Sequence, residues 1–522
     1  MPELIIHGHF YQPPRENPWT GIVDTQPSAA PFHDWNERIH SECYRPNAFV
    51  RVAGPATVEE RIVNNYLNLS FNFGPTLLSW LESNHPDTYA RIVEADRESA
   101  LKRGGHGNAI AQAYGHAILP LCNARDLRTQ IRWGMADFRH RFGRQPEAMW
   151  LPETACNDAV MKVLIDEGLC FVILAPHQAS RVRPSVSTAS GPGSPSGQPA
   201  WGGGCDRSEW RTVDDQSIDT SVPYRFVHPD DSDRSIAVFF YDGPTSRAIA
   251  FENLLRFSHE LVDRLARSAN NREMVNVATD GETYGHHFRF GDLCLAHALE
   301  LDAPARGFNI TNYGEYLEKH PPSLEVQINS GPNGEGTSWS CPHGVSRWIC
   351  DCGCQTGGEP GWNQEWRPPL RQAFDYLRDE NIRHFEATTL FNDPWQARDD
   401  SIELILNQHY SREQFLYDHA GYWLSADEQW RALTYLELQR MLLLMYTSCG
   451  WFFNDISGIE TVQILKYAGR AIDLMEQLGL PSARNQFLEI LAEAKSNRSE
   501  METGADIYRR FVEPTVGAIA SS

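Results

Sequence analysis

The stretch VATDGETYGHH, which spans Val277 to His287, joins a short apolar run to a dense group of acids, glycines and histidines. The apolar run predicts a buried strand that ends near Asp280. Acids and histidines that directly follow a strand are typical of the functional residues at the carboxyl ends of barrel strands. The stretch therefore predicts a strand with a candidate chemical site at its end.

Two other blocks have the same form. The stretch HGHFYQPP, residues 7–14, follows the apolar run Leu4–Ile6, and its two histidines at i and i+2 point to the same face of a strand. The stretch WLPETA, residues 150–155, brings Glu153 to the end of another apolar run. The histidines could instead belong to a polar loop or a metal pair, and Glu153 could cap a following helix.

Short apolar runs alternate with amphipathic stretches through the first part of the chain, which predicts a parallel sheet with crossover helices. The expected strands are residues 4–6, 148–151, 170–174, 236–241 and 275–278, and the expected helices are residues 76–82, 124–141, 158–167 and 253–268. Residues 180–204 are rich in Ser, Pro and Gly and cannot bury enough apolar surface to fold alone. They predict a flexible surface insertion that runs to about residue 222.

The chain changes character after Pro321 and Pro322. Residues 321–369 are rich in Gly, Cys and Trp and are expected to form a loop segment. Beyond them, apolar residues recur with the period of amphipathic helices. The expected helices are residues 370–381, 400–418, 426–447, 460–479 and 483–496. We therefore predict a first domain over residues 1–320, built on the parallel sheet, and an α-helical domain over residues 370–522.

Five motifs together resemble glycoside hydrolase family 57, an α-glucan-active family with a (β/α)7 barrel. HGHFYQPP is similar to the first motif, with two extra residues between His9 and Gln12, and GNAIAQAYGHAILPL, residues 107–121, is similar to the second. WLPETA and TDGETYGHH resemble the third and fourth, and SCGWFF, residues 448–453, resembles the fifth. The C-terminal part also resembles a domain of unassigned function that accompanies one branch of this family. The resemblance implies a distorted (β/α)7-type barrel followed by an α-helical domain.

The resemblance also implies catalytic roles for two carboxyl groups. Glu153 matches the position of the family's nucleophile, and Asp280 matches that of its general acid/base. Retaining glycosidases use such a pair of carboxyl groups on either side of the scissile bond. The expected substrate-binding residues are His7, His9, Gln12, His116, Trp150, Glu282, His286, Trp348 and Trp451.

The resemblance therefore implies a retaining enzyme that cleaves or transfers α-glucosidic bonds, of amylase, 4-α-glucanotransferase or branching type. The sequence leaves open whether water or a sugar hydroxyl accepts the glycosyl unit. One alternative is a metal-dependent polysaccharide deacetylase, which would recruit His7, His9 and Asp280 but leave Glu153 without a role. The other is a barrel that has lost its chemistry and only binds glucan.

The segment CPHGVSRWICDCGC, residues 341–354, offers five possible metal ligands: Cys341, His343, Cys350, Cys352 and Cys354. Thiolates with one His can close a tetrahedral zinc site, but the spacing C-x8-C-x-C-x-C is not the paired pattern of zinc knuckles. We therefore predict a reduced or partly disulfide-bonded loop that lines the cleft, with Trp339, Arg347 and Trp348 facing substrate, and keep a structural metal as the alternative. No cofactor is expected.

The chain has 46 basic and 68 acidic residues, a formal net charge of −22. This balance argues against electrostatic binding to nucleic acid or to an anionic membrane, and it is compatible with a neutral polysaccharide. The 15 Trp residues provide candidate stacking faces for sugar rings. The N-terminus has no signal-peptide pattern and no apolar run is long enough to span a bilayer, so we expect a cytoplasmic protein. The oligomeric state does not follow from the sequence.

Overall fold

The computed structural model describes residues 1–52, 61–185, 209–407 and 409–514. The chain forms two compact units. The first comprises Met1–Gln12, Gln26–Gln112 and Arg141–Ser340, and the second comprises Pro13–Thr25, Ala113–His140 and Cys341–Ser522. The predicted domain boundaries at residues 320 and 369 stay predictions. None of the described helices combines the length and apolar character that crossing a membrane requires.

The first unit contains a ring of seven parallel strands. In ring order they are β12 (Met274–Asp280), β1 (Glu3–Phe10), β4 (Ser70–Phe73), β5 (Ala111–Gln112), β6 (Met149–Trp150), β7 (Phe171–Leu174) and β11 (Asp231–Phe240). Isolated parallel bridges join β4 to the residues before β5, and the residue before β6 to β7. The Asp242 N–H donates to the Asn276 carbonyl at 2.8 Å, which links the end of β11 to β12. The predicted distorted (β/α)7 barrel is confirmed.

The central strands are buried along most of their length, and their largely apolar sequences fit that burial. Every residue of β1 after Glu3 is buried, as expected for a parallel strand that is covered on both faces. β12 is buried up to its last residue, Asp280, which is exposed. The core around them is built from apolar and aromatic side chains of several strands and of α11, among them Ile5, Trp150, Phe171, Phe239 and Tyr313.

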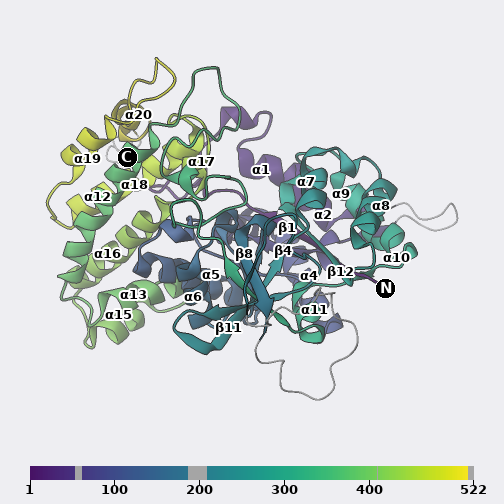
Figure 1. The fold of residues 1–522 in the computed structure, drawn as a ribbon. Coiled ribbons are helices and arrows are strands. Elements are labelled where there is room, and N and C mark those ends of the chain that lie inside the picture. Colours follow the sequence, from purple (N-terminus) through teal and green to yellow (C-terminus); the bar gives the residue numbers. More distant parts are fainter. Residues whose placement is uncertain (53–60, 186–208, 408, 515–522) are drawn as a thin grey trace. The chain divides into compact units, whose positions relative to one another are not determined.

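Helices surround these strands, and Figure 1 shows α4, α7, α8, α9 and α11 around β1, β4 and β12. The helices of this unit are α1 (Trp35–Ile39), α2 (Arg45–Ala48), α3 (Pro75–Asn84), α4 (Pro86–Lys102), α6 (Asp158–Asp166), α7 (Gly243–Phe251), α8 (Ser258–Ala269), α9 (Gly291–His297), α10 (Ala303–Ala305) and α11 (Tyr313–Lys319). The helix expected over residues 253–268 begins only at Ser258. Asn253 is left-handed, with φ 57°, and starts a 3-10 turn instead.

A second sheet extends from the barrel strands β7 and β11. Its order is β7-β11-β10-β14-β8-β9, with β8 (Ala179–Pro184), β9 (Arg211–Thr212), β10 (Tyr224–His228) and β14 (Leu324–Ile328). β8 and β9 pair with each other. β9 and all of β8 except Ala179 lie within the predicted surface insertion, whose residues 186–208 are outside the described residues. The remaining strands of this unit are β2 (Val50–Val52), β3 (Arg61–Val63) and β13 (Asn309–Ile310).

The second unit is helical, as predicted. Its helices are α5 (Ala124–Phe142), whose last two residues belong to the first unit, α12 (Arg367–Glu386), α13 (Pro394–Asp400), α14 (Ile402–Leu406), α15 (Arg412–Ala420), α16 (Ala426–Leu444), α17 (Cys449–Phe452), α18 (Ile459–Gln477), α19 (Arg484–Leu491) and α20 (Gly504–Phe511). The prediction of one helix over residues 400–418 is wrong. Asn407 is extended, and the Ser411 side chain accepts the Gln414 N–H to start α15, so the chain turns between two short helices.

Candidate active site

Several of the predicted site residues lie at the carboxyl ends of barrel strands in the first unit. His7 and His9 are on β1, and Asp280 is the last residue of β12. The parallel ladder sets His9 opposite Asp280. Glu153 follows β6 in the chain, in the 3-10 turn Pro152–Thr154. Side chains from three strands therefore reach the same end of the barrel, which is the end that carries the active sites of barrel enzymes.

The backbone at Glu153 has an uncommon conformation. Glu153 has φ 58° and ψ 21°, and Thr154 has φ 48°, so two successive non-glycine residues are left-handed. This conformation costs on the order of 1–2 kcal/mol for each residue. Gln178 holds the turn, because it accepts the Thr154 hydroxyl at 2.9 Å and donates to the Thr154 carbonyl at 2.8 Å. Strain that is held in place by its surroundings is typical of functional positions.

The Glu153 carboxylate is oriented by two donors from the segment before residue 341. Its Oε2 accepts the indole N–H of Trp339 at 3.0 Å and the hydroxyl of Ser340 at 2.6 Å. The Trp339 backbone N–H also donates to the Glu153 carbonyl at 3.0 Å. An ionised carboxylate accepts such donors without offering a proton, so this arrangement fixes Glu153 as an acceptor.

Asp280 has a different environment from Glu153. Its side chain is accessible to solvent, yet it is surrounded by enough protein to lose much of its hydration. This desolvation, together with the negative charge of Glu153, raises the pKa of Asp280 to about 7. The Asp280 charge in turn adds to burial in raising the pKa of Tyr241. The site thus holds one carboxyl group poised near neutral pH beside a second that is oriented as an acceptor.

Glu282 lies inside the protein, two residues beyond Asp280. Its Oε1 accepts the Tyr44 hydroxyl at 2.6 Å and the Tyr11 backbone N–H at 3.0 Å. Burial and the charge of Asp280 raise the pKa of Glu282 to about 8, against the opposing effect of the Tyr44 hydrogen bond. A substrate-binding role for Glu282 stays a prediction.

The two strand histidines pack against Trp150. The ring of Trp150 stacks on His7 at 4.8 Å and on His9 at 5.0 Å between centroids. Both imidazoles contact Asn72 on β4, and His7 also bonds Ser70 at 2.9 Å. Burial lowers the pKa of each histidine to about 3, so both rings are neutral at physiological pH. Neutral imidazoles can act toward a sugar hydroxyl as either donor or acceptor.

Two further predicted residues of the first unit lie near its surface. Gln12 is half-buried and is the last residue before the chain first enters the second unit. His286 is half-buried, and its Nδ1 lies 2.5 Å from the Glu42 carboxylate. Their contact with substrate stays a prediction.

The remaining predicted residues, His116, Trp348 and Trp451, belong to the second unit. In this unit, residues of the second motif contact residues of the fifth. The Nδ1 of His116 lies 2.6 Å from the Ser448 hydroxyl, and the Ser448 N–H donates to the His116 carbonyl at 2.9 Å. Trp348 and Trp451 line a pocket of this unit, and the Arg371 guanidinium lies 4.7 Å from the Trp451 ring. Both indoles are almost fully covered. Their role as stacking faces stays a prediction.

Sequence reasoning missed several residues that shape the site. Ser340 bonds Glu153, Tyr44 bonds Glu282, and Asn72 connects both strand histidines to Gln112. Asn72 lies near the carboxyl end of its strand, as Asp280 does, so its position was the one available signal. Ser340 and Tyr44 have no such signal, because they follow no predicted strand.

Comparison with protein families identifies the family of this chain. Residues 30–329 match the family described as Glycosyl hydrolase family 57, which is more than half of the chain. The chain belongs to glycosyl hydrolase family 57. Residues 362–521 match a domain of unknown function, DUF3536, which covers most of the helical part.

Curated relatives of this family 57 protein include α-amylases. The α-amylase of Pyrococcus furiosus is 23% identical over 319 residues, which is 59% of this chain and 40% of the amylase. The α-amylase of Pyrococcus abyssi is 21% identical over 339 residues, or 63% of this chain and 43% of the amylase. Alpha-amylase 1 of Dictyoglomus thermophilum is 26% identical over 107 residues, or 20% of this chain and 15% of the amylase. The family 57 chain therefore matches less than half the length of each of these relatives.

Solved structures share its fold. An exo-type maltose-forming amylase from Pyrococcus sp. ST04 has a TM-score of 0.67 at 14% identity, over 94% of this chain and 82% of that one. The family 57 branching enzyme of Pyrococcus horikoshii has a TM-score of 0.52 at 14% identity, over 98% and 95% of the two chains. The 4-alpha-glucanotransferase of Thermococcus litoralis has a TM-score of 0.51 at 15% identity, over 93% and 62%. At these identities the likeness concerns the fold.

Proposed function

We propose that this protein is a retaining enzyme that cleaves or transfers α-glucosidic bonds, with Glu153 as nucleophile and Asp280 as general acid/base. The observation that carries the proposal is the contrast between the two carboxyl groups. Glu153 accepts hydrogen bonds from Trp339 and Ser340, while desolvation and the Glu153 charge raise the pKa of Asp280 to about 7. A nucleophile must be ionised and a general acid must hold a proton at working pH, and these environments favour that division.

The reaction would proceed in two displacements. In the first, the Glu153 carboxylate bonds to the anomeric carbon while the bond to the glycosidic oxygen breaks and the Asp280 proton passes to that oxygen. In the second, the Asp280 carboxylate takes a proton from water or from a sugar hydroxyl, whose oxygen bonds to the anomeric carbon and releases Glu153. The anomeric configuration is retained because it is inverted twice.

An α-glucan is the substrate class that the comparisons favour. The chain belongs to glycosyl hydrolase family 57, its curated relatives include α-amylases, and proteins of similar fold include a branching enzyme and a 4-alpha-glucanotransferase. Neutral polysaccharide also agrees with the net charge of −22. Whether water or a glucan hydroxyl is the acceptor would be read from the products on amylose: short sugars, exchanged chain lengths or new branches.

The two alternatives have less support. A deacetylase would need a metal held near the strand histidines, but neither of the metal-competent side-chain groups found in the described residues includes His7, His9 or Asp280. His7 is instead engaged with Ser70 and Asn72. Release of acetate from an acetylated polysaccharide would support that alternative. Binding of every tested α-glucan without turnover would support a barrel that has lost its chemistry.

The test of the proposal is a pair of isosteric variants, Glu153→Gln and Asp280→Asn, assayed on maltooligosaccharides, amylose and glycogen. Both should lose activity, by roughly 10²–10⁴-fold for the loss of general acid/base catalysis at Asp280. The matched control is Glu260→Gln, which removes an exposed acid of α8 and should keep wild-type activity. Near-wild-type activity of either site variant would refute the assignment.

Chemical rescue separates the two roles. With azide and a glucosyl substrate that has a good leaving group, Glu153→Ala should give the glycosyl azide of inverted configuration, because azide replaces the enzyme nucleophile. Asp280→Ala should give the azide of retained configuration, because Glu153 still forms the intermediate. The reverse pattern would exchange the two assignments.

A further inference from the structure

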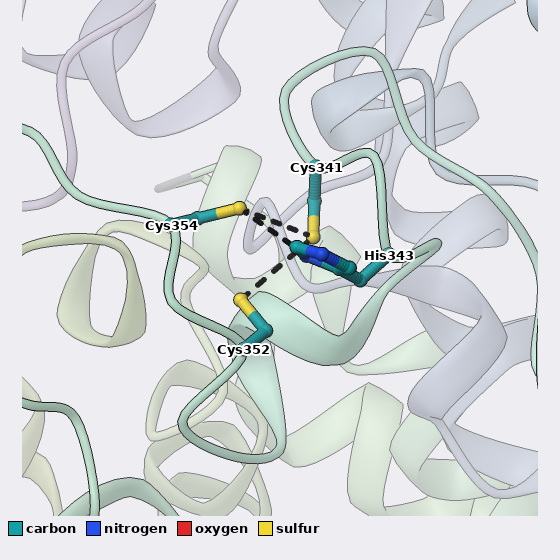
Figure 2. Close-up of side chains that lie close together, drawn as sticks. All are labelled: Cys341, His343, Cys352 and Cys354. Carbon is teal, nitrogen blue, oxygen red and sulfur yellow. Dashed lines mark hydrogen bonds between the residues drawn. The ribbon is translucent and has the colours of Figure 1, made fainter.

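Four side chains of the second unit converge in the segment that follows Ser340. The sulfur atoms of Cys341, Cys352 and Cys354 and one ring nitrogen of His343 all lie within 4.8 Å of one another. Figure 2 shows the three thiols and the imidazole directed toward a common centre from two turns of the same loop. Each of the four can supply one ligand atom to a metal ion.

Three distances among these atoms are close to those between ligands on a tetrahedral zinc ion. The Cys341 sulfur lies 3.8 Å from that of Cys354 and 4.0 Å from that of Cys352, and the Cys354 sulfur lies 3.6 Å from His343 Nδ1. Tetrahedral zinc with Zn–S of about 2.3 Å and Zn–N of about 2.0–2.1 Å separates two sulfurs by about 3.8 Å, and a sulfur from a nitrogen by about 3.6 Å. A disulfide would require about 2.05 Å between sulfurs. Cys341, Cys352 and Cys354 form no disulfide.

The fold selects four of the five candidate ligands in the sequence. The Cys350 thiol points to the Ser346 carbonyl, 3.6 Å away, and is not part of the cluster. The ligand pattern is therefore C-x-H-x8-C-x-C. Cys341 and His343 come from one turn of the loop, and Cys352 and Cys354 come from the other. Gly353 has φ 80°, a left-handed conformation that lets the chain turn between Cys352 and Cys354.

The surroundings of the cluster fit metal-bound thiolates. The backbone N–H groups of His343 and Arg347 hydrogen-bond the Cys341 sulfur, as outer-sphere donors do in metal sites. The Arg367 guanidinium interacts electrostatically with Cys352 and Cys354. Three thiolates and a neutral imidazole around a divalent ion leave one excess negative charge, which this cation helps to balance.

We propose that Cys341, His343, Cys352 and Cys354 bind one zinc ion as a structural site. Thiolates with imidazole select zinc over the hard cations that prefer oxygen ligands, and four protein ligands leave no coordination position for a substrate. The ion would cross-link a segment in which η11 (Ser346–Trp348) is the one helical turn among described residues 329–366. This site is independent of the proposed glycosidase chemistry, although Cys341 directly follows Ser340 in the chain.

The test begins with the wild-type chain, purified under reducing conditions without chelators and without a polyhistidine tag. Elemental analysis should find about one zinc per chain, and an organomercurial reagent should release it as it modifies the thiols. Reconstitution with Co²⁺ should give thiolate-to-cobalt charge transfer and the strong visible bands of a tetrahedral ion. A reduced wild-type protein without stoichiometric metal and without these bands after Co²⁺ addition would overturn the proposal.

Matched variants locate the site. Cys354→Ser should lose most of the bound zinc and the charge-transfer bands, whereas Cys350→Ser, in the same loop but outside the cluster, should keep both. Equal zinc contents of the two variants would refute this ligand set. If Cys354→Ser does not fold, protection of thiols from alkylation in wild-type protein, with and without zinc, gives the same distinction, because Cys341, Cys352 and Cys354 should be protected and Cys350 should not.

Discussion

The raised pKa of Asp280 is the most direct consequence of its surroundings in the site. Desolvation by the surrounding protein and the charge of Glu153 raise this pKa from 3.8 to about 7. At pH 7 about half of the Asp280 carboxyls would then hold a proton, against about one in 1,600 at the ordinary pKa. The environment therefore increases the competent acid form by roughly 800-fold at neutral pH. If Asp280 is the general acid, as proposed, kcat/KM of the wild type should fall as pH rises through about 7.

Glu153→Gln tests the electrostatic part of this argument, because it removes the charge and keeps the shape of the side chain. The pKa of Asp280 should fall, on the order of one unit, and should stay above 3.8 because desolvation is its larger cause. Since this variant should not turn over substrate, the pKa is measured by infrared titration of the carboxyl stretch, and Asp280→Asn identifies the signal. Glu260→Gln should leave it unchanged. The same Asp280 pKa in wild type and Glu153→Gln, or a wild-type value near 3.8, would refute the reasoning.

Three further predictions concern the residues around the pair. Glu282→Gln should remove a pH-dependent loss of stability. Because the pKa of Glu282 is raised in the folded state, the free energy of unfolding of the wild type should fall as pH rises from about 4.5 to 8, by a few kcal/mol at most. Urea unfolding should therefore show that the free energy of unfolding of the variant increases relative to that of the wild type across this range. Ser340→Ala should lower kcat/KM by roughly 10- to 100-fold through loss of one charge-assisted hydrogen bond to Glu153, and an unchanged value would show that Trp339 suffices. Gly281→Ala should destabilise the protein by about 1–3 kcal/mol, since a Cβ there would lie 2.2 Å from the Phe10 ring; an unchanged melting temperature would contradict this contact.

The helices and strands whose formation depends on residues adjacent in the chain could be predicted from the sequence. β1 contains the apolar run Leu4–Ile6, β12 is mostly apolar from Met274 to Ala278, and α16 and α18 carry long helical patterns, so local composition was enough to place them. The prediction of a single helix over residues 400–418 was wrong, because capping at Ser411 and the extended conformation of Asn407 outweighed the periodic apolar pattern. Strands β5 and β6 have two residues each, too few to give a periodic signal, and only their pairing in the barrel defines them.

The sequence by itself determined which residues could carry the chemistry. Two acids at strand ends, two strand histidines and a cysteine-rich segment are local patterns, and each can be recognised from a few adjacent residues. Tertiary structure decided how those residues behave. It brought Ser340 to Glu153, raised the pKa of Asp280, and chose Cys341, Cys352 and Cys354 over Cys350. Hydrogen bonding, desolvation and charge interaction depend on distance in space, and residues far apart in the chain acquire those distances only when it folds.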